Sequence, residues 1–145
     1  MREIGLILLY GLTSFDDLKT KQVRVFEIVS FGILGIVLNV ISPMNSIYSI
    51  IGAILVGVVL YIFSVFSKEK IGKGDAMIVM VSGLYLGFTN VMILLWISSL
   101  LALIVGLITM KKLKVDSSYE IPFVPFLMSG FLIMYGISLF RSLSV

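Results

Sequence analysis

The 145-residue chain contains neither cysteine nor histidine. These absences exclude disulfides, thiol nucleophiles, zinc sites built from Cys and His, and hydrolases that depend on a serine–histidine pair. Any catalytic group must therefore be the side chain of an Asp, Glu, Lys, Tyr, Ser or Thr.

Charge is also scarce, since 13% of the residues are charged, against about 25% in a soluble domain. Hydrophobic residues make up 59% of the chain and its mean hydropathy is +1.16, so most of it must be solvated by lipid. At roughly 20 residues per span the chain has room for about six helices and no separate soluble domain. We expect an all-α polytopic membrane protein with a single membrane-embedded domain over residues 1–145.

Apolar runs alternate with short polar segments along the whole chain. The first run begins like a secretory signal, but it lacks a clear small-x-small cleavage site, so we expect it to be retained as a span. We expect a turn at residues 88–90 between the fourth and fifth runs. Small residues in the second and third runs indicate close helix packing; they are Gly32, Gly35, Gly52 and Gly57. The runs cover residues 1–17, 25–42, 46–66, 75–88, 90–110 and 121–141.

The basic residues predict the orientation of these helices. Of eleven Lys and Arg, nine fall in three segments: Lys19, Lys21 and Arg24; Lys68, Lys70 and Lys73; Lys111, Lys112 and Lys114. By the positive-inside rule these segments face the cytoplasm, which places both termini outside. The positive charge therefore indicates membrane orientation, and we expect no nucleic-acid partner.

The segment Gly72-Lys73-Gly74-Asp75 places a carboxylate at the start of the fourth run. An ionisable side chain at the membrane is costly and marks a candidate functional site. Its two glycines permit positive φ and close backbone approach, which suits a loop that receives an extended substrate strand. Glycines at the end of a helix in a basic loop are also common without any function. We take Gly72, Lys73 and Gly74 as a candidate active-site loop.

A second acidic spot, Asp16 and Asp17, ends the first run on the same predicted side of the membrane. If one of them meets Asp75, the two carboxyl groups can share one proton. Such a dyad hydrolyses an amide with no metal or cofactor, because one carboxylate activates water while the protonated one supports the oxyanion. The same acids can instead be helix-end groups that pair with loop cations or with a helix dipole. The residues alone leave both interpretations open.

Three segments match, in order, the motifs of one protease family. The first is Asp17-Leu18-Lys19-Thr20-Lys21-Gln22-Val23, similar to a D-L-[RK]-x-[RK]-x-[IV] element. The second is Gly72–Asp75 followed by Gly83-Leu84-Tyr85-Leu86-Gly87, and the third is Ile121-Pro122-Phe123-Val124-Pro125-Phe126. Together they resemble the type IV prepilin peptidases, which are membrane aspartyl proteases of the GxGD type.

The resemblance implies that Asp17 and Asp75 are the catalytic pair, and it selects Asp17 over Asp16 because the motif counts from Asp17. The implied substrates are pilin-like precursors with a short basic leader ahead of a hydrophobic helix. They would be cut at the cytoplasmic face of a prokaryotic inner or plasma membrane. Pro122 and Pro125 would shape the cleft, although prolines near a helix start are common in any protein.

Two positions depart from the family pattern. Val23 is followed by Arg24 where the family usually has proline, and Met77 stands where a lysine is frequent. Both changes bear on specificity more than on chemistry. The short, cysteine-free chain resembles the small peptidase-only members that serve Flp/Tad-type pili, without the methyltransferase region of larger members.

Two other functions stay open at the level of the sequence. A non-enzymatic transport or assembly subunit would use the acids for ion coupling or salt bridges. A presenilin-like protease would keep the dyad but cut within the bilayer. The residues identify neither the pilin nor an oligomeric state.

Overall fold

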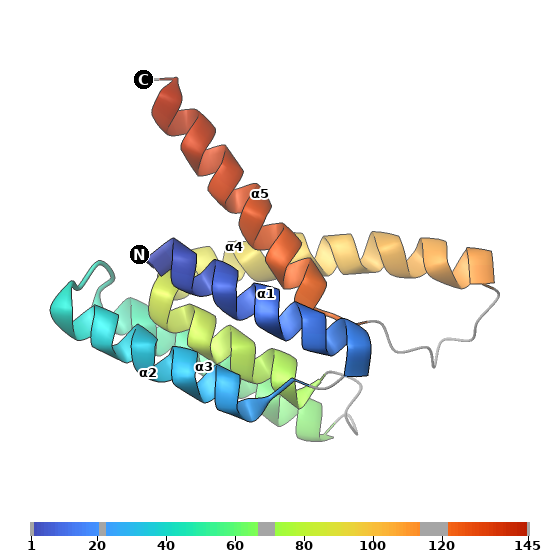
Figure 1. Ribbon diagram of the computed structural model, residues 1–145, viewed down its shortest axis with the longest axis horizontal. Coiled ribbons are helices and arrows are strands. Elements are labelled where there is room, and N and C mark those ends of the chain that lie inside the picture. The colour runs from blue at the N-terminus through green and yellow to red at the C-terminus, as the bar shows by residue number, and fades with distance from the viewer. Residues whose placement is uncertain (1, 21–22, 67–71, 114–121, 145) are drawn as a thin grey trace.

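All regular structure in the described residues is helical. The computed structural model describes residues 2–20, 23–66, 72–113 and 122–144. Lys21, Lys68, Lys70 and Lys114 of the basic segments, and Ile121, lie outside them. Within this part of the chain there are five helices (Figure 1): α1 (Arg2–Thr20), α2 (Val25–Ile41), α3 (Ile47–Phe66), α4 (Lys73–Leu113) and α5 (Val124–Leu143). The all-α prediction is confirmed.

Across the described ranges, three helices are long and apolar enough to cross a membrane, namely α3, α4 and α5. α2 is apolar but has 17 residues, and α1 carries charged residues at both of its ends. By length and composition these helices indicate a membrane protein. The count of about six spans and the outside placement of both termini stay predictions.

The fourth and fifth apolar runs are two halves of α4 that meet at a bend. Gly87 breaks the helix with φ 73° and ψ 177°, a left-handed φ that glycine adopts without steric cost. Residues 88–90 are helical, so the expected break between the two runs is present but lies at Gly87, one residue before the expected turn. Figure 1 shows the two halves running in roughly opposite directions from the bend.

Polar side chains replace the hydrogen bond that the bend removes. In an unbroken helix the Phe88 N–H would donate to the Leu84 carbonyl. Here the Phe88 N–H donates to Ser49 Oγ at 2.9 Å, and Asn39 Nδ2 donates to Leu84 O at 2.6 Å. Lipid offers no hydrogen-bond partners to backbone groups. The side chains of α2 and α3 therefore stabilise the bend by binding the two backbone groups that it leaves unpaired.

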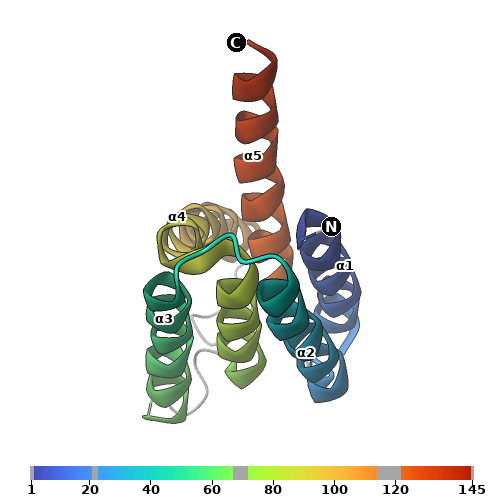
Figure 2. The same ribbon diagram turned by 90° about the vertical axis from the view of Figure 1, so that its left-hand side faces the viewer.

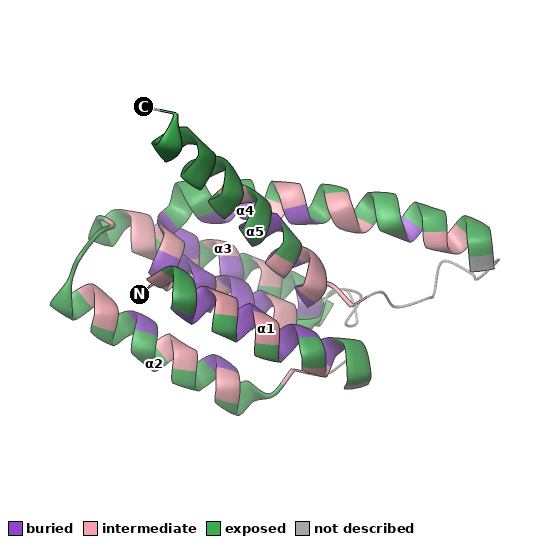
Figure 3. Ribbon diagram, turned by 45° about the horizontal axis from the view of Figure 1, so that its top comes forward, coloured by how far each residue is buried: buried purple, intermediate pink, exposed green. Residues whose placement is uncertain are grey.

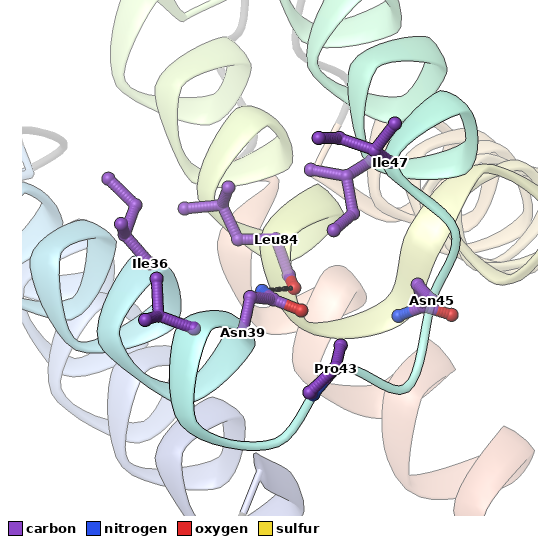
Figure 4. A pocket seen from close by; sticks show the side chains of 8 residues that line it. Ile36, Asn39, Pro43, Asn45, Ile47 and Leu84 are labelled. Carbon is purple, nitrogen blue, oxygen red and sulfur yellow. Dashed lines mark hydrogen bonds between the residues drawn. The ribbon is translucent and has the colours of Figure 1, made fainter.

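A mainly apolar pocket of about 340 Å³ lies beside the bend (Figure 4). Asn39 reaches across its wall to the Leu84 carbonyl, and Asn45 Nδ2 donates to Tyr85 O at 3.2 Å. Leu84 is nine residues beyond Asp75, about 13 Å along the helix axis, so this pocket is separate from the acids. Its lining consists of Ile36, Asn39, Val40, Pro43, Asn45, Ile47, Ile50 and Leu84.

The best-buried part of the molecule lies between α1, the first half of α4 and the start of α5. Figure 2 shows α3, the first half of α4, α2 and α1 side by side, with α5 projecting away from them. Figure 3 shows that buried residues concentrate on the inner faces of these helices, while the end of α5 is exposed. The core includes Leu6, Leu9, Tyr10, Ile78, Val79, Val124 and Leu127.

α3 and α4 approach closely because small residues line their contact. A Cβ added to Gly83 would lie 2.7 Å from Ala53 Cβ, and one added to Gly57 would lie 2.8 Å from the Met80 backbone nitrogen. Both distances are too short for non-bonded atoms, so larger residues would push the helices apart. The prediction of close packing at Gly57 is confirmed.

This contact predicts that Gly57→Ala destabilises the protein. The added methyl group would overlap the Met80 backbone, and overpacking of this kind costs about 1–3 kcal/mol. Thermal unfolding in detergent should show a lower midpoint for Gly57→Ala. Gly136→Ala is the matched control, since a Cβ there has no neighbour within 4 Å. An equal midpoint for the two variants would contradict the packing argument.

Candidate active site

Three helices converge where Asp17 and Asp75 lie. The end of α1, the start of α4 and the start of α5 lie near one another (Figure 1). Asp17 is 7% exposed and Asp75 is partly buried. The two carboxyl groups are near enough for charge repulsion between them. The fold thus brings together two acids that are far apart in the sequence.

The start of α5 holds the Asp17 side chain. The Val124 backbone N–H donates to Asp17 Oδ2 at 3.1 Å, and Val124 itself is fully buried. The first N–H groups of a helix have no partner within the helix, and this end carries the positive pole of the helix dipole. Asp17 is therefore oriented and partly compensated by a fixed backbone group.

Pro122 and Pro125 flank the residue that binds Asp17. Pro125 occupies the first turn of α5, where a missing N–H costs no hydrogen bond. Sequence reasoning did not identify Val124, because it acts through a backbone N–H that any residue except proline supplies. The signal that could have found it is its position between the two prolines.

The glycines before Asp75 allow close contacts. The Gly72 backbone N–H donates to the Asp75 carboxylate, and a Cβ on Gly72 would lie 2.8 Å from Asp75 Oδ2. A Cβ on Gly74 would lie 3.2 Å from Val23 Cβ. Among the described glycines only Gly87 has positive φ, so of the two properties that glycine permits at positions 72 and 74, positive φ is not used. Close approach is what these glycines supply.

Lys73 begins α4 between the two glycines and is exposed. Met77, the residue at the other departure from the family pattern, is half-buried and packs against the core. Met77 therefore places an apolar side chain two residues after Asp75, at the position where the family pattern often has a charged lysine.

Asp16 faces a different partner from its neighbour Asp17. Arg24 Nε lies 3.1 Å from Asp16 Oδ2, and Arg24 Nη1 lies 3.8 Å from Glu27 Oε1. Adjacent residues of a helix point about 100° apart, which explains how the two acids reach different surroundings. The interfacial ion pair considered for these acids is thus present at Asp16, and it uses the arginine that departs from the family pattern.

Comparison with protein families gives one match. Residues 4–107 match the model of the type IV leader peptidase family. This range contains both Asp17 and Asp75 and ends before Pro122. No curated protein and no solved structure gave a match. Because the matched range covers well over half of the sequence, the chain belongs to the type IV leader peptidase family.

Proposed function

We propose that the protein is a membrane aspartyl endopeptidase that removes the leader peptide of type IV pilin-like precursors at the cytoplasmic membrane face. In this proposal Asp17 and Asp75 are the catalytic pair. The observation that carries it is the approach of these two poorly exposed carboxyl groups at the junction of three helices. Family membership supplies the class of reaction.

Structural roles account for each acid alone but not for their approach. Asp75 lies in the first turn of α4 and binds the Gly72 backbone there. Asp17 binds the Val124 N–H at the start of α5. Neither bond requires the two carboxyl groups to be close, and like charges that are partly shielded from water repel each other strongly. A shared proton removes that repulsion and is what an aspartyl dyad needs.

The proposed reaction uses these two side chains and one water molecule. The ionised carboxylate takes a proton from the water molecule, and the oxygen of this water bonds to the carbonyl carbon of the scissile peptide. The protonated carboxyl group hydrogen-bonds the developing oxyanion. When the C–N bond breaks, the leaving nitrogen takes up a proton from the dyad, which returns to its starting state. The Val124 N–H keeps Asp17 in place throughout.

The positions of the acids along their helices support leader removal over cleavage inside the bilayer. Asp17 lies in the last turn of α1 and Asp75 in the first turn of α4. Both therefore lie at helix ends, at the level where a basic leader would join a hydrophobic segment. Gly72 and Gly74 place no side chain beside Asp75, which supports entry of an extended strand there.

Asn substitutions test the dyad. Asp17→Asn and Asp75→Asn should each reduce cleavage of a co-expressed prepilin by about 10²-fold or more, because general acid–base catalysis contributes this much. The readout is the size shift of the precursor. Asp16→Asn is the matched control and should retain cleavage, since Asp16 pairs with Arg24. If both dyad variants cleave normally, the proposal fails. Lost transport or assembly without any cleavage would favour the non-enzymatic alternative.

The position of the cut separates leader removal from presenilin-like proteolysis. Mass spectrometry of the products should place the cut between the basic leader and the hydrophobic segment, because both acids lie at helix ends. A cut in the middle of the hydrophobic segment would instead support proteolysis within the bilayer. A precursor incubated with the Asp75→Asn variant serves as the background control.

The glycine next to the Asp75 carboxylate makes a further prediction. In Gly72→Ala the new methyl group would overlap Asp75 Oδ2 and displace it. Misplacing a catalytic group by about 1 Å can cost about 10²-fold in rate, so we expect a large loss of kcat with little change in the unfolding midpoint. Gly11→Ala has no neighbour within 4 Å at its Cβ and should retain activity. Full activity of Gly72→Ala would exclude this role.

A further inference from the structure

We infer that Tyr10 and Ser82 are positioning residues that set the register of α1 against α4 and thereby bring Asp17 opposite Asp75. Their effect on cleavage rests on the proposed function. Their effect on the helix register does not, and can be measured without activity.

A directed hydrogen bond joins the two side chains in the core. Tyr10 Oη and Ser82 Oγ are 2.6 Å apart, and both residues are fully buried. Ser82 Oγ donates its one proton to the Ile78 carbonyl at 2.7 Å. The Tyr10 hydroxyl must therefore donate to Ser82 Oγ. Separating the pair would leave a buried phenol without its acceptor, which is costly where no water is present.

The spacing of this pair matches the spacing of the acids. Tyr10 lies seven residues before Asp17, and Ser82 lies seven residues after Asp75. Seven residues are about two helical turns, so each partner lies nearly on the same helix face as its acid and about 10 Å along the axis. Figure 1 shows α1 and the first half of α4 running in opposite directions. In an antiparallel pair, Tyr10 opposite Ser82 therefore implies Asp17 opposite Asp75.

The other contacts between these helices are less specific for register. Most of the buried neighbours, such as Leu6, Leu9, Ile78 and Val79, are apolar and can repack after a shift. A single buried polar pair is instead a known means of specifying helix register. Thr13 donates to the Leu9 carbonyl of its own helix at 2.6 Å. The Phe131 ring lies 5.6 Å from the Tyr10 ring, so α5 also holds the phenol in place. A slip by one turn, about 5.4 Å, would separate the acids.

Kinetics of a double-mutant cycle test the pair. Tyr10→Phe and Ser82→Ala should each lower kcat for a prepilin about fivefold to tenfold, because each variant loses one buried hydrogen bond. KM should be unchanged, because neither variant removes a contact with the substrate. The double variant should be no slower than the singles, since both remove the same bond. The control Tyr48→Phe changes a tyrosine that is 84% exposed and should match the wild type.

Cross-linking measures the register directly, since the chain has no cysteine of its own. The inferred register predicts that Asp17→Cys combined with Asp75→Cys forms a disulfide under mild oxidation, and this bond would report the register because it forms only when the two Cα atoms come within about 7 Å. Adding Tyr10→Phe or Ser82→Ala should slow this about fivefold or more. The pair Ser14→Cys and Asp75→Cys, one turn out of register, should cross-link slowly and gain speed in the same backgrounds.

The outcomes separate this inference from the proposed function. Unchanged kcat and unchanged cross-linking in both single variants would overturn the inference while the effects of the Asp variants stand. A double variant much slower than either single would show that the two residues act independently, which also overturns it. If the wild type cleaves no precursor, the proposed function fails and cross-linking alone decides the register. If Ser82→Ala does not fold because it leaves the buried phenol without an acceptor, Tyr10→Phe, which keeps the ring and removes the hydroxyl, decides the result.

Discussion

The contact between α1 and the first half of α4 is the constraint on which the site depends. Asp17 and Asp75 lie near one end of this contact, and the Tyr10–Ser82 hydrogen bond lies about two helical turns from them. Apolar packing alone would place the two helices side by side and let the acids move apart. We infer that the hydrogen bond between Tyr10 and Ser82, two turns away, opposes that movement and keeps the two acids near each other.

The remaining helices support this contact from both sides. α5 supplies the Val124 N–H to Asp17 and the Phe131 ring to Tyr10, and so touches the buried face of α1 at two points. α3 packs on α4 where Gly57 and Gly83 let the backbones approach. The bend at Gly87 lets α4 turn back, with its freed carbonyl and N–H groups satisfied from α2 and α3. Several of these supports are close backbone approaches or polar bonds to backbone groups, which lipid cannot replace.

Much of the fold followed from the apolar runs, because lipid solvation requires continuous apolar helices whatever their partners. The runs at 25–42 and 46–66 became α2 and α3 within a residue at each end. The break between the fourth and fifth runs lies at Gly87, one residue before the turn expected at 88–90, and its freed backbone groups bind Asn39 and Ser49, which are far away in the sequence. Local composition carries no information on such remote partners.

The sequence by itself indicated that most of this chain is solvated by lipid, because its apolar runs are long and its charges few, and it excluded cysteine and histidine chemistry, because it has neither residue. The motif pattern selected Asp17 over Asp16 as a hypothesis. Only the tertiary structure decided that Asp16 pairs with Arg24, that Asp17 binds the start of α5, and that Asp17 approaches Asp75. The physical reason is that the groups that bind a carboxylate, such as backbone N–H groups and charged side chains, are brought to it by the packing of helices. The spacing of residues along the sequence does not specify which of these groups a given carboxylate contacts.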